Sequence, residues 1–150
     1  MQQHANLRDR MTAVCCVAVI AALYVVGFVS RTELRHVVQT LPLWIGAILG
    51  YLGAPIARWL ALPLFLLWLI LMSLIWLYLL GWAQVIHGHF SPVEIAMTLV
   101  VGISSLLGIV GCGPRIQGTG LLTGGVVFVL SAGFQVVMMY VSFLPEFAHR

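Results

Sequence analysis

The sequence predicts an all-α fold, a polytopic transmembrane helical bundle. Hydrophobic residues make up 62% of the 150-residue chain and charged residues only 7%, which is too little polar surface to cover a soluble domain. The apolar residues gather in runs of ~20, the length that a helix needs to cross the hydrocarbon core of a bilayer. We therefore predict one bundle over residues 1–150, with five spans.

The first span is predicted over residues 11–29. A polar stretch with Arg8 and Arg10 precedes it, as in a signal peptide. The apolar run is longer than the ~7–15 residues of a signal-peptide core, and no small-residue cleavage pattern closes it before Arg31. We expect an uncleaved first span.

The second span, predicted over residues 40–57, is the weakest of the five. Pro42 lies near its expected first turn, where a missing N–H is tolerated. The preceding residues 31–39 are amphipathic, which favours a short helical turn at the membrane surface. If this second segment is re-entrant or interfacial, the bundle has four spans.

A ladder of small residues lies on the second span. Gly46, Gly50 and Ala54 recur at every fourth position, a spacing that lets membrane helices approach one another closely. We therefore predict a close helix contact along this face.

The third span, residues 60–81, is the most lipophilic. Trp59 and Trp82 flank it, and 23 residues of helix (82 − 59) extend ~34 Å. That length separates the two aromatic belts of a membrane protein. We expect this span to present the most surface to lipid.

The fourth and fifth spans are predicted over residues 92–110 and 121–144. The fourth opens with a capping box, in which Ser91 is the cap, Pro92 the first helical residue and Glu94 the third. We predict a helix that begins at Pro92, with the Ser91 hydroxyl accepting from the Glu94 N–H.

The arginines favour a cytoplasmic N-terminus. Five spans place four of them on the inner side and three on the outer side: Arg8, Arg10, Arg58 and Arg115 against Arg31, Arg35 and Arg150. If the second segment does not cross the membrane, the arginine count no longer favours a cytoplasmic N-terminus. All seven basic residues are arginine, which suggests a GC-rich bacterial genome and hence a bacterial cytoplasmic membrane.

The histidines are a candidate metal site. His87 and His89 share one turn, and His36 or His149 could add a third nitrogen beside a carboxylate such as Glu94. Imidazole and carboxylate ligands suit zinc, copper or iron. The turn lacks the i, i+4 spacing of a helix-borne motif, so the competing interpretation is a set of solvated loop histidines.

A polar stripe is the second candidate site. Its residues repeat at helical spacing on the fourth and fifth spans: Thr98, Ser105, Ser131, Gln135 and Ser142. Gln135 lies near mid-span, where an unpaired amide is costly, so we expect it to bond to a serine hydroxyl (Ser131, Ser104 or Ser105), a freed carbonyl or water. The stripe either lines a small polar cavity or packs helices together, and we favour packing.

Several function classes lose support. No charged residue or histidine lies near the centre of a span, which counts against ion-coupled transport, proton relays and haem b. The three cysteines Cys15, Cys16 and Cys112 are interpreted as small buried hydrophobes. A charge of +3 is too small and scattered to indicate nucleic acid. We predict no cofactor.

The leading hypothesis is a small non-catalytic membrane protein, either an accessory or scaffold subunit or a self-associating bundle. The expected partners are the lipid bilayer and other membrane subunits or copies of the chain. One alternative is a small-molecule channel or carrier lined by the Gln135 stripe. Another is a membrane metal-binding protein or enzyme that uses His87 and His89.

Overall fold

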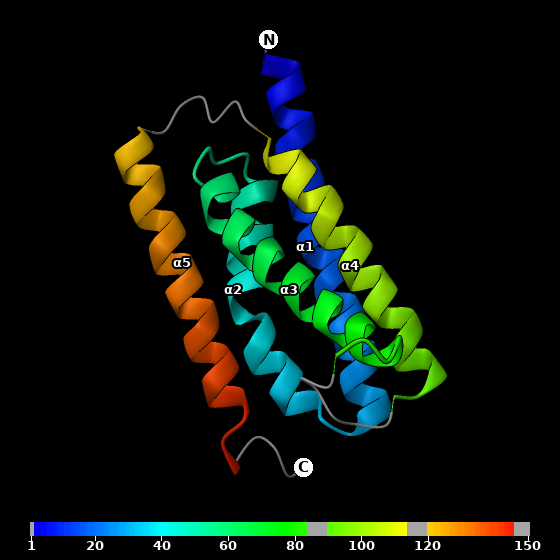
Figure 1. Ribbon diagram of the computed structural model, residues 1–150. Helices are drawn as coiled ribbons and strands as arrows, with labels where there is room; N and C mark the ends of the chain where they lie inside the picture. Colours follow the sequence, from blue (N-terminus) through cyan, green and yellow to red (C-terminus); the bar gives the residue numbers. More distant parts are fainter. Residues whose placement is uncertain (1, 84–89, 114–119, 146–150) are drawn as a thin grey trace.

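The computed structural model describes residues 2–83, 90–113 and 120–145, with side chains described from residue 10 onward, and these ranges contain helices and no strand. The helices lie side by side and alternate in direction (Figure 1). Their bounds are α1 (Gln2–Ser30), α2 (Glu33–Tyr51), α3 (Ala57–Leu79), α4 (Pro92–Cys112) and α5 (Leu121–Ser142). The predicted all-α class is confirmed.

Four of these helices are long and apolar enough to cross a membrane, which makes the protein a transmembrane helical bundle. The four stretches are Arg10–Ser30, Ala57–Leu79, Pro92–Cys112 and Leu121–Ser142. They overlap the predicted first, third, fourth and fifth spans. The second predicted span has no counterpart among them, so length and hydropathy support four spans rather than five.

The helix α2 is displaced toward the N-terminus from the predicted span 40–57. It begins at Glu33, so the amphipathic residues expected to form a separate surface turn are its first two turns. A glutamate in the first turn stabilises this start through the helix dipole. Pro42, expected near the start, consequently lies inside the helix.

Gly53 ends α2 earlier than predicted. Its φ of +70° is a left-handed conformation that glycine adopts at low cost. The N–H of Gly53 donates to Gly50 O at 3.1 Å, and that of Ala54 donates to Leu49 O at 3.0 Å, which is a Schellman motif. Ala54 therefore lies in the turn, and only Gly46 and Gly50 of the predicted ladder are on the helix, both buried.

Gly46 brings α2 close to two other helices. A Cβ at Gly46 would lie 3.3 Å from Cys16 Sγ on α1 and 3.7 Å from Ala61 Cβ on α3. Gly108 of α4 similarly receives the ring of Phe65 of α3, 2.5 Å from where a Cβ would be. These close approaches surround the buried core of α1, α2, α3 and α4.

The helix α5 lies at the edge of the bundle (Figure 1). Within the described residues it packs against α2 and α3, and not against α1 or α4. Gly124 faces the Trp59 indole of α3 so closely that a Cβ there would overlap the ring. The bundle is therefore a four-helix core with α5 attached to one side.

The predicted start of α4 is confirmed. The helix begins at Pro92, and the Ser91 Oγ accepts from the Glu94 N–H at 3.3 Å. The Glu94 carboxylate in turn accepts from the Ser91 N–H at 2.7 Å, which completes the capping box.

Candidate functional site

Gln135 anchors α5 to α2. The side chain is fully buried, and its Nε2 donates to the backbone carbonyl of Gln39 at 3.0 Å. Our prediction that this amide points into the bundle and is bonded within the protein is confirmed, and the acceptor is a backbone carbonyl. The partner comes from α2 and not from the serines that we expected to be nearest.

The Gln39 carbonyl lies in the helical turn that a proline interrupts. Pro42, three residues later and inside α2, has no N–H and cannot complete the helical bond to Val38. In membranes, neighbouring helices provide hydrogen-bond partners at such interrupted turns. The Gln135 amide is such a partner.

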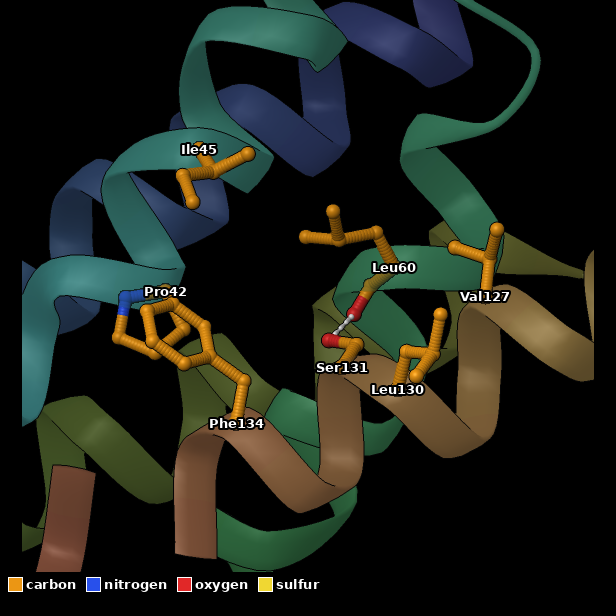
Figure 2. A pocket seen from close by; sticks show the side chains of 7 residues that line it. All are labelled: Pro42, Ile45, Leu60, Val127, Leu130, Ser131 and Phe134. Carbon is orange, nitrogen blue, oxygen red and sulfur yellow. Dashed lines mark hydrogen bonds between the residues drawn. The ribbon is translucent and has the colours of Figure 1, made fainter. Parts of the chain in front are cut away.

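The same arrangement recurs on α3. Ser131 Oγ donates to the Leu60 carbonyl at 2.7 Å, and Leu60 lies three residues before Pro63, which is inside α3 (Figure 2). Ser131 and Gln135 are four residues apart and hence on one face of α5. We call these two bonds, Gln135 to Gln39 and Ser131 to Leu60, the proline contacts.

Gln39 also uses its side chain at this interface. Its Nε2 donates to the buried Ser142 Oγ at 2.9 Å, and Ser142 Oγ donates to the Met139 carbonyl at 2.6 Å. Three predicted stripe residues, Gln135, Ser131 and Ser142, thus all lie where α5 meets α2 and α3.

The other two stripe residues lie elsewhere. Thr98 Oγ1 accepts from Trp76 Nε1 of α3 at 3.1 Å and donates to the Ile95 carbonyl at 2.7 Å. Ser105 is fully buried, and its hydroxyl has no hydrogen-bond partner among the described residues. Because α4 packs on α1 and α3, the structure does not bring the two halves of the stripe to one cavity.

Of the proposed metal ligands, His87 and His89 lie outside the described residues. His36 is in the first turn of α2, outside the four candidate spans, and packs against Gly27 of α1. Burial, together with the neighbouring Arg35, lowers the pKa of His36 to about 4, so the imidazole is neutral at pH 7. In the described part of the chain, no three His, Cys, Asp or Glu side chains are grouped to hold a metal.

A pocket of about 290 Å³ lies between α2, α3 and α5, beside the proline contacts (Figure 2). Seven side chains line it: Pro42, Ile45, Leu60, Val127, Leu130, Ser131 and Phe134. All but Ser131 are apolar, and the Ser131 hydroxyl is already bonded to Leu60. The chemistry that the pocket offers a ligand is therefore apolar contact.

Sequence reasoning missed Gln39, Pro63 and the interior position of Pro42. One signal was present, since two prolines interrupt apolar segments of a chain predicted to be helical. Each such proline leaves a carbonyl of its own helix without its usual N–H partner, and a neighbouring helix is one source of a replacement donor. Which helix supplies that donor depends on packing, which the spacing of residues along one helix does not encode.

No protein-family model, curated protein or solved structure matches the chain.

Proposed function

We propose that this protein is a small non-catalytic membrane protein that acts as an accessory or scaffold subunit and assembles laterally with other membrane proteins or with copies of itself. One observation carries the proposal. The donor groups of Gln135, Ser131 and Gln39 are all engaged in holding α5 to α2 and α3. The polar stripe therefore serves the assembly of helices.

The same bonds weigh against a channel or carrier lined by the Gln135 stripe. A path for a polar solute needs polar groups that face open space, whereas Gln135 is fully buried and the neighbouring pocket is apolar. One buried acceptor, Gln135 Oε1, has no partner among the described residues. A single unpaired atom does not make a path.

The outer surface of α5 supports lateral assembly. In the most apolar stretch of each helix, half of the residues of α1 are buried in the bundle, against 17% of those of α5. Large apolar side chains such as Leu122, Val129 and Tyr140 are exposed along α5. Such a surface fits acyl chains or the helices of another membrane protein.

We also propose that α2 makes a fifth crossing, with its first turn, Glu33–His36, at the membrane surface. In Figure 1, α1 and α3 run in the same direction, so α2 returns the chain from one end of the bundle to the other. Leu41, Trp44 and Ile48 give α2 an exposed apolar side that suits lipid. Five crossings would place the two termini on opposite sides.

The charges suggest an orientation for this bundle. Arg10 begins the apolar stretch of α1 and Arg58 is in the first turn of α3, and these two helices start on the same side of the bundle (Figure 1). Arg31 follows α1 and Arg35 is in the first turn of α2, on the other side. With Arg8 and Arg115 added from the sequence, we propose that the N-terminus is cytoplasmic, in a bacterial cytoplasmic membrane.

The test is to extract the tagged full-length chain from its own membrane in mild detergent and to weigh it intact by native mass spectrometry. We expect a stoichiometric complex with another membrane protein or with further copies. A monomer that conducts a solute after reconstitution would refute the proposal in favour of a channel, and a monomer with stoichiometric bound metal would favour the metal-binding alternative.

A further inference from the structure

We propose that the pocket between α2, α3 and α5 binds one acyl chain of an anionic phospholipid, with the headgroup at the end of the bundle that carries Arg58. The inference goes beyond the proposed function. It rests on the membrane location of the chain and stands whether or not the protein joins a complex.

The lining of the pocket selects hydrocarbon. Ile45, Leu60, Val127, Leu130 and Phe134 provide apolar contact and no hydrogen bond. The one hydroxyl, from Ser131, is already bonded to the Leu60 carbonyl, so a polar ligand would lose its hydrogen bonds to water without replacement. Within a bilayer, the abundant molecule of matching chemistry is a lipid chain.

The pocket is held open by fixed contacts. Toward one end, Gly124 of α5 rests on the Trp59 indole of α3. Toward the other end, the proline contacts of Ser131 and Gln135 tie α5 to α3 and α2. Because α5 is attached at both levels, it cannot close on α2 without breaking these contacts.

The volume suits a segment of an acyl chain. The pocket measures about 290 Å³. An engineered apolar cavity of ~150 Å³ is already large enough to hold benzene. The side chains of Val127 and Phe134 lie seven residues apart on α5, so the lining follows about two helical turns, as an elongated ligand requires.

Charge identifies the headgroup. Arg58 is in the first turn of α3, two residues before the pocket residue Leu60. Arg10 begins the apolar stretch of α1, which starts at the same end of the bundle as α3. The acidic residues with described side chains, Glu33 and Glu94, are in the first turns of α2 and α4, which start at the opposite end. This end therefore attracts an anionic headgroup.

The probe is a phosphatidylglycerol that carries a photoactivatable diazirine in one acyl chain. The full chain is reconstituted with it in phosphatidylcholine vesicles and irradiated, and the adducts are mapped by mass spectrometry. We expect adducts to concentrate on Ile45, Val127, Leu130 and Phe134. Adducts spread evenly over exposed residues such as Val129 would overturn the proposal.

Two matched variants test whether the labelling depends on the pocket. Val127→Trp fills the pocket, and we expect it to lower pocket labelling by roughly tenfold because its indole occupies the space of the ligand. Val129→Trp, on the same helix at a residue that is 67% exposed, should label as the wild type does. Unchanged labelling in a folded Val127→Trp protein would contradict the proposal. If that variant does not fold, the wild-type adduct map decides.

The headgroup is tested with the same diazirine chain on phosphatidylcholine, in the same vesicles. We expect severalfold weaker labelling of the pocket than with phosphatidylglycerol. Equal labelling would overturn the assignment of an anionic lipid. Pocket residues without any lipid adduct in the folded wild type would also overturn the proposal.

Discussion

Gln135 and Ser131 each donate to a backbone carbonyl that lies three residues before a proline. Each proline interrupts the hydrogen bonds of its own helix, and α5 provides a donor to the same turn. The amide and the hydroxyl, which would be costly without a partner in lipid, are thus paired inside the bundle. At the scale of single residues, this pairing explains why polar side chains occur in so apolar a helix.

The cap of α4 gives a prediction at this scale. Ser91→Ala removes the acceptor for the Glu94 N–H and should destabilise the protein by about 1 kcal/mol, measured by denaturant unfolding in detergent. Ser73→Ala is the matched control, because that hydroxyl donates to the carbonyl of Leu69 on its own helix and is exposed. Equal losses in the two variants would contradict a role for the capping box.

His36 predicts a pH dependence. Burial and Arg35 depress the folded-state pKa to about 4, below the ordinary 6.5, so the unfolded chain binds more protons between these values. The contribution of His36 to stability is therefore complete above pH 6.5 and is lost as pH falls toward 4. Thermal unfolding in detergent should show this loss in the wild type.

The control for that titration is His36→Asn, which retains a polar side chain that does not ionise. We expect its stability to vary less with pH between 6.5 and 4 than that of the wild type. An identical pH profile for both proteins would show that other groups cause the loss.

At the scale of elements, α5 depends on few contacts. It meets only α2 and α3 in the described part of the chain, and a glycine at position 124 allows the Trp59 indole to lie against its backbone. The four core helices by contrast share one buried cluster. We infer that α5 is the helix whose attachment is most sensitive to single substitutions.

Two adjacent glycines test that inference. Gly124→Ala places a methyl group against the Trp59 ring and should weaken the docking of α5 by ~1–3 kcal/mol, as overpacking does. Gly125→Ala adds the same atom where nothing lies within 4 Å and should be neutral or slightly stabilising. Limited proteolysis and unfolding in detergent measure both. Indistinguishable variants would refute the close contact.

At the scale of the whole molecule, the sequence predicted the fold class and four spans because hydropathy and length govern membrane crossing directly. It misplaced the second segment. There, a glutamate in the first turn and a left-handed Gly53 favour the observed bounds of α2, and these local features outweigh its hydropathy.

The candidate site was predictable only in part. Helical spacing placed Ser131, Gln135 and Ser142 on one face, and the cost of a buried amide required an internal partner for Gln135. Spacing along one helix carries no information about its neighbours. The roles of Gln39 and Pro63, and the separation of Thr98 and Ser105 from the α5 residues, therefore had to come from the packing.

A fifth crossing by α2 predicts that the termini lie on opposite sides of the membrane. Tags at each end, probed with protease in right-side-out vesicles, should show a protected N-terminal tag and an accessible C-terminal tag. Two tags with the same accessibility would exclude the fifth crossing. The reverse pattern would keep the crossing and invert the orientation.

The central claim is that the polar face of α5 holds a scaffold together and does not form a path, and Gln135→Leu tests it most directly. Leucine fills the space of the amide and removes one hydrogen bond, and such bonds in membranes are often worth only ~0.6 kcal/mol. We predict a folded variant that forms the same stoichiometric complex as the wild type in native mass spectrometry. A folded variant that loses the complex, or a wild type found only as a solute-conducting monomer, would contradict the account.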